Sequence, residues 1–571
     1  MQRRMLPLAV LALVLAACAR GGPAAPTPSG GAYDLVIENG RVVDGTGAAW
    51  FYGDVAVRGD RIAAVEPRGV LRNASAKRRL DAKGMVVSPG FIDIQGQSYD
   101  AFLRGDGRDV SKVTQGITTE ILGEGSTPAP VNERRLAGDG AVEARDRQLA
   151  SRFTGPRGFD AFLRAMEEHG ISPNVGSFLG AATIREYAKG EAMGDPTPAE
   201  LDTMRAVVRR AMEDGAFGIG SALIYPPGNY ATTRELIEEA RAMAPYGGVY
   251  ITHMRSEADK YLEAIDEAMR IGRDGGVPVE IYHLKAAGQA NWSKAAQAIA
   301  KIDSARAAGL DVQADMYPYT AGGTGLSACF PPAASEGGKL FTRLADPAER
   351  GRIKAEVLHQ TSDWENLCTQ ATPAGVLLVG FRNPDNGKWV GKRLSEVAQS
   401  MGKDWIETAM DLVLSDRSRI GTLFFLMDEE NVKLQLRQPW IKIGTDAGGM
   451  DPDSAKGNLA HPRAYGTYPR ILGRYVRDEK VLPLEDAIRK MSSAVATRLS
   501  LTDRGVLRPG MYADIVVFDP ATIIDRATYE QPHQLSVGVE HVFVNGVEIV
   551  SGGKHTGAKP GRVVRGPGWR K

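Results

Sequence analysis

The chain has 571 residues and a formal net charge of +1, from 70 basic and 69 acidic side chains. This balance gives no reason to expect a nucleic-acid partner or a broad attraction to acidic lipids. The length suffices for one large hydrophobic core and a second, smaller domain, and 66 Gly with 32 Pro predict the long loops of an enzyme.

The N-terminus carries an export pattern. Two arginines precede apolar residues 5–17, a stretch too short to span a bilayer. The stretch ends in LAAC, which resembles a bacterial lipoprotein signal, in which the cleaved chain begins at a lipid-modified cysteine, here Cys18. We therefore expect a signal peptide at 1–17, a flexible tether at 18–32 and a lipid anchor as the only membrane contact, on the periplasmic side of the cell envelope. The alternative is an ordinary secretory signal with a chance cysteine.

Short strands bounded by turn signals occur at both ends of the chain. Near the start, NG at 39–40 and GD at 59–60 each separate two apolar runs and predict two hairpins. Near the end, NG at 545–546 predicts another. Strands at both ends with helix-rich sequence between them predict one small β-sandwich, formed by residues 33–85 and 501–571.

Eight apolar runs alternate with helical sequence between these ends. They are residues 86–94, 116–123, 174–180, 216–223, 249–252, 279–282, 311–317 and 441–445. Near-continuous apolar runs suit parallel strands covered on both faces. We therefore predict an α/β fold, a (β/α)8 TIM barrel over residues 86–500, with a long insertion at about 320–438. Cys329 and Cys368, both in the insertion, form one candidate disulfide.

Polar side chains follow several of these strands, where a barrel of this kind places its chemistry. His253 and His283 end strands five and six, Glu124 follows strand two and Asp446 follows strand eight. A single histidine at a strand end is more often structural, but two on neighbouring strands beside carboxylates predict a divalent-ion site. Because such an ion activates water near neutral pH, Asp446 is the candidate acceptor of the water's proton.

Several motifs, spread over roughly residues 33–552, occur together. They include VSPGFIDI, TQGITTEILGEG, YITHMRSE, EIYHLKAAG, ADMYPYTAGGT, IGTDAGG and HPRAYGTYPRILG. Together they resemble the amidohydrolase superfamily, specifically the N-acyl-D-amino-acid deacylase (D-aminoacylase) family. The resemblance implies a metal-dependent barrel that hydrolyses the amide of an N-acylated D-amino acid. It implies His253 and His283 as Zn²⁺ ligands and Asp446 as the catalytic aspartate.

The resemblance also implies a group that binds the substrate. Lys285, Tyr317 and Arg463 match the family's residues around the substrate's α-carboxylate, and charge-assisted hydrogen bonds from such a set fix a carboxylate's orientation. For Arg463 the alternative is a surface arginine paired with a nearby aspartate. Tyr225, in LIYPPGNY, is a candidate for the mouth of the site, with packing inside a turn as the alternative.

The sequence departs from the family pattern in two places. The family has His-x-His after strand one, whereas this chain has Gln95-Gly96-Gln97, and amides bind metals more weakly than imidazoles. Gln95 and Gln97 are instead candidates to orient a water or to donate hydrogen bonds to the substrate. The family's cysteine ligand after strand two is matched by Gly125, so Glu124 is the nearest substitute, an ordinary loop carboxylate being the alternative. We therefore expect one Zn²⁺, or another divalent ion, per chain.

The expected partner is a small-molecule substrate with a free carboxylate. Three other functions stay open. The first is a dipeptidase or cell-wall peptide hydrolase of the same superfamily. The second is a cyclic-amide hydrolase or deaminase, disfavoured because the carboxylate-binding residues suit an open α-carboxylate. The third is a non-catalytic binding lipoprotein that has lost the metal, which the presence of both histidines, Asp446 and the carboxylate-binding residues argues against.

Overall fold

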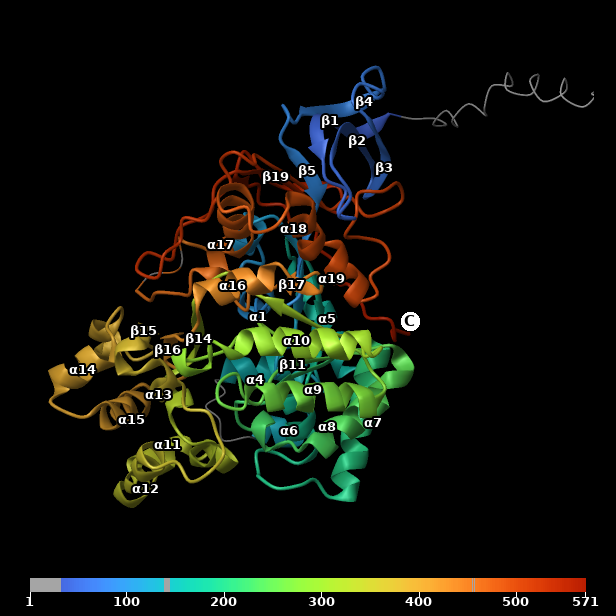
Figure 1. Ribbon diagram of the computed structural model, residues 1–571. Coiled ribbons are helices and arrows are strands. Elements are labelled where there is room, and N and C mark those ends of the chain that lie inside the picture. The colour runs from blue at the N-terminus through green and yellow to red at the C-terminus, as the bar shows by residue number, and fades with distance from the viewer. Residues whose placement is uncertain (1–31, 138–143, 454, 456, 571) are drawn as a thin grey trace, which may run out of the picture.

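The computed structural model describes residues 32–137, 144–453, 455 and 457–570. The expected signal peptide, Cys18 and all but the last residue of the expected tether lie outside the described residues. Figure 1 shows a strand-rich end, a central barrel and an insertion beside the barrel. Within the described part of the chain, no helix combines the length and apolar character that crossing a membrane requires.

Both ends of the chain contribute strands to one nine-stranded sheet, in the order β21-β20-β19-β18-β5-β1-β2-β3 with β4 beside β1. Its strands are β1 (Tyr33–Val42), β2 (Phe51–Arg58), β3 (Arg61–Pro67), β4 (Ala76–Asp81), β5 (Val86–Pro89), β18 (Ile515–Phe518), β19 (Val539–Val544), β20 (Val547–Ser551) and β21 (Lys554–His555). The two halves meet where β18 pairs antiparallel with β5. Ile62 of β3 donates its N–H to the Met511 carbonyl at 2.9 Å, so the sheet folds back on itself, and the predicted two-ended β-sandwich is confirmed.

One predicted hairpin of this sheet is wrong. The NG dipeptide at 39–40 does not reverse the chain but lies inside β1, whose pairing with β2 shifts between Ile37 and Gly40. Asn39 has φ 59°, so the positive φ that the dipeptide favours forms a β-bulge instead of a turn. The chain stays extended because β1 pairs with β2 on one side and with β4 and β5 on the other. The hairpins at 59–60 and 545–546 are confirmed.

The barrel consists of parallel strands in two continuous series, β6-β7-β8 and β9-β10-β11-β12-β13-β17. These are β6 (Phe91–Asp93), β7 (Ile117–Leu122), β8 (Asn174–Ser177), β9 (Leu179–Gly180), β10 (Gly218–Ala222), β11 (Val249–His253), β12 (Val279–Ile281), β13 (Val312–Met316) and β17 (Ile441–Ile443). Only Phe178 separates β8 from β9. At the other seam, Asp446 donates its N–H to the Gln95 carbonyl at 2.9 Å and closes the ring. The predicted (β/α)8 barrel is confirmed, although predicted strand 86–94 is divided between β5 and β6.

Helices cover the outside of the barrel (Figure 1). The longer ones are α5 (Gly158–His169), α6 (Ala181–Ala188), α7 (Pro198–Asp214), α8 (Thr233–Met243), α9 (Tyr261–Gly275), α10 (Lys294–Ala307), α16 (Glu429–Leu436), α17 (Arg463–Arg470) and α18 (Leu484–Met491). The shorter ones include α1 (Tyr99–Leu103), α2 (Val110–Val113) and α19 (Ser493–Arg498). Helix α7 begins with a capping box, in which the Thr197 side chain accepts the Glu200 N–H and Pro198 takes the first helical position.

The insertion between β13 and β17 has its own sheet and its own hydrophobic core. Its elements are β14 (Ala321–Gly325), β15 (Val376–Gly380), β16 (Gly421–Phe425), α11 (Leu340–Ala345), α12 (Pro347–Leu358), α13 (Leu367–Ala371), α14 (Leu394–Met401) and α15 (Trp405–Asp416). The three strands are antiparallel, with β16 between the other two. The predicted disulfide between Cys329 and Cys368 is confirmed inside this core.

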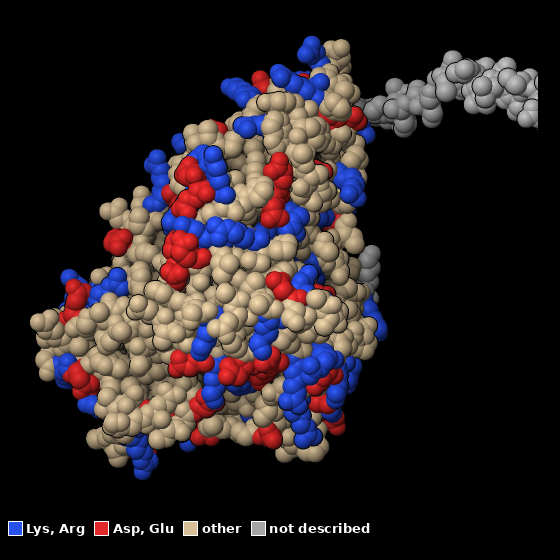
Figure 2. Space-filling model, viewed as in Figure 1, with Lys and Arg blue, Asp and Glu red and all other residues tan. Residues whose placement is uncertain are grey.

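Charged side chains of both signs are interspersed over the face shown in Figure 2. Lys and Arg there lie beside Asp and Glu, as expected from the near-neutral net charge. The described part of this face therefore shows no large area of a single charge that would indicate a charged macromolecular partner.

Candidate active site

Three side chains from three barrel strands converge at the carboxyl end of the barrel. One oxygen of Glu124, Oε1, lies 3.3 Å from His253 Nδ1 and 3.3 Å from His283 Nε2. The three donor atoms all lie within 4.8 Å of one another. Two imidazoles and one carboxylate are a common donor set for a catalytic zinc with an open position for water. These residues therefore fit a single divalent ion, and Glu124 takes the place that its neighbour Gly125 cannot fill.

The glycines beside Glu124 explain why the carboxylate stands at this position. Gly123 and Gly125 have φ of 112° and 69°, which side-chain-bearing residues rarely adopt. A Cβ on Gly125 would lie 2.8 Å from the Ala222 Cβ, and one on Gly123 would lie 2.4 Å from the Phe178 carbonyl oxygen. A ligand side chain therefore fits at 124 and not at 125.

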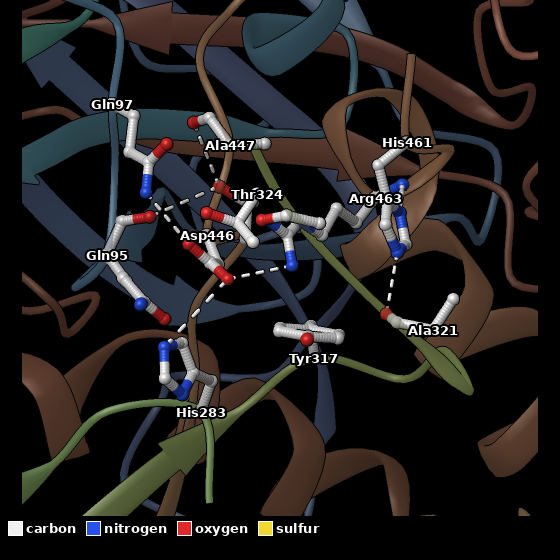
Figure 3. A network of polar contacts seen from close by, with 12 residues as sticks. Gln95, Gln97, His283, Tyr317, Ala321, Thr324, Asp446, Ala447, His461 and Arg463 are labelled. Carbon is white, nitrogen blue, oxygen red and sulfur yellow. Dashed lines mark hydrogen bonds and ion pairs between the residues drawn. The ribbon is translucent and has the colours of Figure 1, made fainter. Parts of the chain in front are cut away.

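Gln95 and Gln97 contact the carboxylates of the site through their amide nitrogens. The Gln95 amide nitrogen donates to Glu124 Oε2 at 2.8 Å, and the Gln97 nitrogen donates to the same oxygen at 3.0 Å. Gln97 also donates to Asp446 Oδ1 at 2.8 Å (Figure 3). The atoms that make these contacts are amide nitrogens, whose N–H groups cannot coordinate a cation, while the Gln95 side-chain carbonyl oxygen is buried and has no hydrogen-bond partner among the described residues.

The buried charges make the centre of the site attractive to a cation. Burial alone would raise the pKa of Glu124, but hydrogen bonds to His253 and His283 outweigh it and hold that pKa well below its usual range. Burial and Lys285 would lower the pKa of His283, yet Glu257, Asp446 and Glu124 raise it to about 10. A positive charge at His283 is thus strongly stabilised, as a coordinated metal ion would be. Burial lowers the pKa of His253, which favours the neutral imidazole that a metal requires.

Asp446 lies beside this centre and keeps a carboxylate directed at it. Its Oδ2 is 4.0 Å from His283 Nε2 and 2.7 Å from the Arg463 guanidinium (Figure 3). Burial raises the pKa of Asp446 to about 6, against the opposing effect of Arg463. A carboxyl group with a pKa in this range is suited to both accepting and releasing a proton near neutral pH.

Two of these residues have strained backbones. His283 has φ 33° and Asp446 has φ 51°, in the left-handed region that non-glycine residues rarely adopt. The His283 N–H is held by Asp315 Oδ1 at 2.8 Å, and the Asp446 N–H by the Gln95 carbonyl. Strain of this kind persists only where the surroundings over-determine the geometry, as they do at active sites.

Glu257 and Lys285 contact His283 at Nδ1, the ring nitrogen that does not face Glu124. The Lys285 ammonium lies 2.7 Å from both Glu257 Oε1 and His283 Nδ1, and Glu257 Oε1 is 3.0 Å from the same imidazole nitrogen. Glu257 does not pair with Arg255, which instead contacts Glu267 at 3.0 Å. Glu257 therefore braces His283, as ligating histidines require.

Two of the three expected carboxylate-binding residues, Arg463 and Lys285, lie near the ring of the third, Tyr317. Tyr317 follows β13 and is buried; Arg463 Cζ lies 4.6 Å from its ring centroid and Lys285 Nζ lies 5.9 Å from it. Arg463 is buried, so it is not a surface arginine, and the nearby Asp451 pairs with Arg108.

A cavity of about 670 Å³ opens onto the site. Tyr225 lines it, with its ring centroid 5.3 Å from that of His253, so it lies beside the donor set and not within a remote turn. The insertion supplies other parts of the wall, including Thr324 and Arg419. Both were missed, because Thr324 lies seven residues beyond the end of the seventh predicted strand and Arg419 lies within the insertion; the glycines before Thr324 were the available signal.

The barrel, the mixed nitrogen and oxygen donor set and the adjacent aspartate define a metal-dependent hydrolase of the amidohydrolase type. Residues 407–550 match the model of the amidohydrolase family. The chain is 34% identical to D-aminoacylase of Alcaligenes xylosoxydans xylosoxydans over 93% of this chain and 97% of that protein. It is 35% identical to the N-acyl-D-glutamate deacylase of the same organism, over 93% and 96%.

The comparison of structures agrees with the comparison of sequences. The N-acyl-D-glutamate deacylase of Bordetella bronchiseptica, in complex with zinc and a phosphonate inhibitor, superimposes with a TM-score of 0.75 and 31% identity, over 94% of this chain and all of that one. The chain belongs to the D-aminoacylase family of the amidohydrolases.

We expect Glu124→Gln to lower zinc affinity roughly 100-fold, because a neutral amide replaces the charged donor. Zinc content after dialysis against a graded series of chelator concentrations measures the change. Glu186→Gln is the matched control, since Glu186 lines the same cavity but is paired with Arg135. Equal zinc retention by Glu124→Gln and the control would remove Glu124 from the donor set.

Proposed function

We propose that this protein is a zinc-dependent hydrolase that cleaves the amide bond of N-acyl-D-amino acids. The observation that carries the proposal is the meeting of Glu124, His253 and His283 in one cavity with Asp446 beside them. The names of its relatives, D-aminoacylase and N-acyl-D-glutamate deacylase, support the substrate class.

The polar residues around the proposed zinc site each have a place in this reaction. Glu124, His253 and His283 would hold the zinc, which when bound lowers the pKa of a water and polarises the substrate carbonyl. Asp446 takes the proton of the attacking water and returns it to the nitrogen that leaves, so one carboxylate acts first as base and then as acid. Gln97, which donates to Asp446 and to Glu124, keeps the two carboxylates at a fixed separation.

The α-carboxylate of the substrate is bound by Arg463, Lys285 and Tyr317. Each cation already faces an internal carboxylate: Arg463 faces Asp446 at 2.7 Å and Lys285 faces Glu257 at 2.7 Å. The substrate carboxylate would therefore share these cations, which have further donor hydrogens to offer. Arg463 Nε makes no hydrogen bond within the described residues and is buried, which leaves it available for this contact.

We further propose that the mature chain is lipid-anchored at Cys18 on the periplasmic side of the envelope. The pattern LAAC after an apolar stretch supports this. The disulfide between Cys329 and Cys368 also suits an oxidising compartment.

A substrate panel tests the proposed reaction. We expect the zinc-loaded protein to release the acyl group from N-acetyl-D-amino acids, and Asp446→Asn to reduce kcat about 100-fold or more while keeping its zinc. The N-acetyl-L-amino acids serve as controls for stereochemistry, and D-containing dipeptides test the alternative peptidase. Wild-type rates from Asp446→Asn would exclude Asp446 as the proton carrier, and hydrolysis of the dipeptides alone would favour the peptidase.

The role of Arg463 is tested by comparing each N-acetyl-D-amino acid with the analogue whose carboxylate is converted to an amide. Arg463→Met should raise KM about tenfold or more for N-acetyl-D-amino acids, because a charged hydrogen bond to the α-carboxylate is lost. For the amide analogues, Arg463→Met should raise KM by a smaller factor. An equal loss for both would show that Arg463 acts only through Asp446.

Lipid attachment is tested at Cys18. In cells fed radiolabelled palmitate, the wild-type chain should carry label in the membrane fraction, and Cys18→Ser should carry none, since the thiol that accepts the lipid is missing. Label that persists in Cys18→Ser would place the modification elsewhere, and unlabelled wild-type protein would favour the ordinary secretory signal.

A further inference from the structure

The active-site cavity contains a second arginine that the proposed chemistry does not use. Arg419 lies between α15 and β16 and lines the same cavity as His253 and Asp446. Its Nη2 donates to Thr324 Oγ1 at 2.7 Å, and its Cζ lies 5.8 Å from the ring centroid of Tyr225. Among the described residues, no carboxylate lies within 4 Å of its guanidinium. A cation in a cavity wall with no acidic partner is free to bind an anionic part of the ligand.

Strand β14 brings this arginine next to the carboxylate-binding set. Arg463 Nη2 contacts the Gly323 carbonyl at 3.4 Å, and Arg419 contacts Thr324, the next residue of the strand. Successive strand residues are about 3.3 Å apart, so the two guanidiniums are anchored at neighbouring points of one strand. A ligand held at Arg463 by one carboxylate can therefore reach Arg419 with a second one on a short side chain.

The glycines of β14 leave room for Arg419 and Arg463 beside the strand. A Cβ on Gly325 would lie 2.5 Å from Arg419 Cγ, and a Cβ on Gly323 would lie 3.4 Å from Arg463 Nη2. A side chain at Gly325 would displace Arg419 from the wall. Because the residues from Ala321 to Gly325 have small side chains, two arginine side chains can pack against this strand.

Besides Glu124, Glu257 and Asp446, the acidic residues Glu186 and Glu191 line the cavity. Glu186 is neutralised by Arg135 at 3.0 Å, so its charge opposes an incoming anion only weakly. Among the described residues no carboxylate pairs with Arg419, so no ion pair there offsets its attraction for an anion.

We infer that Arg419 binds a second carboxylate of the substrate, so that the preferred substrates are N-acylated acidic D-amino acids. This inference rests on the proposed function. The guanidinium would pair with the side-chain carboxylate in the planar geometry that arginine favours, while Arg463 and Lys285 hold the α-carboxylate.

The test compares N-acetyl-D-glutamate with N-acetyl-D-glutamine, which has nearly the same shape but no side-chain charge. In the zinc-loaded wild-type protein we expect kcat/KM to be about tenfold or more higher for the glutamate compound. Arg419→Met should reduce this ratio about tenfold, and Arg419→Lys should retain part of it. Arg352→Met is the matched control, since Arg352 is an exposed arginine of α12 in the same insertion.

The outcomes separate the two proposals. A ratio that is the same in wild type, Arg419→Met and Arg352→Met, with turnover of both compounds, would overturn the role of Arg419 and leave the deacylase intact. No turnover of any N-acyl-D-amino acid by zinc-loaded protein would overturn the proposed function and this inference with it. A loss of the ratio confined to the Arg419 variants would establish the inference.

Discussion

The site depends on one carboxylate whose two oxygens face different partners. Glu124 Oε1 points between the two imidazoles, at 3.3 Å from each, while Oε2 receives the amide hydrogens of Gln95 and Gln97. A carboxylate with both oxygens engaged cannot rotate, so Oε1 stays directed at the point where the histidine nitrogens converge. On the proposed function, the amide nitrogens of the Gln-x-Gln motif orient the ligand Glu124. This explains why amides, which are poor donors to metals, stand at the end of the first barrel strand.

The sequence allowed the barrel and most of the site to be predicted, because parallel strands deliver the residues after their carboxyl ends to one place. His253, His283 and Asp446 stand out because imidazole and carboxylate side chains follow the ends of these strands and because they match the family's motifs. The NG dipeptide at 39–40 predicts a turn but forms a bulge, since a positive φ occurs in both and only the pairing partners of β1 decide between them. Arg419 could not be predicted, because it reaches the cavity from the insertion, which follows no repeating strand and helix pattern.

The insertion also contacts the loop after the fifth barrel strand, β11. Its Glu365 accepts hydrogen bonds from the Ser256 hydroxyl at 2.7 Å and from the N–H groups of Glu257 and Ala258 at 2.9 and 3.1 Å. Burial raises the pKa of Glu365 to about 7. The loop that it holds carries Glu257, which in turn contacts Lys285 and His283. The insertion thus fixes the residues behind one imidazole at the same time as it forms the cavity wall.

The closure of the barrel and the placement of the site follow from the same buried ion pair. At the end of β6, Asp93 Oδ1 accepts the N–H groups of Gln95 and Thr445, while Oδ2 lies 2.7 Å from the ammonium of Lys112. Both charged side chains are wholly buried, and Lys112 also lies 3.5 Å from Glu120, so removing Lys112 would leave buried carboxylates without this counter-charge. Asp93 thereby ties the first strand to the eighth immediately before Gln95 and Asp446. The hydrogen bond between Gln97 and Asp446 can form at 2.8 Å because the backbones that carry them are already joined.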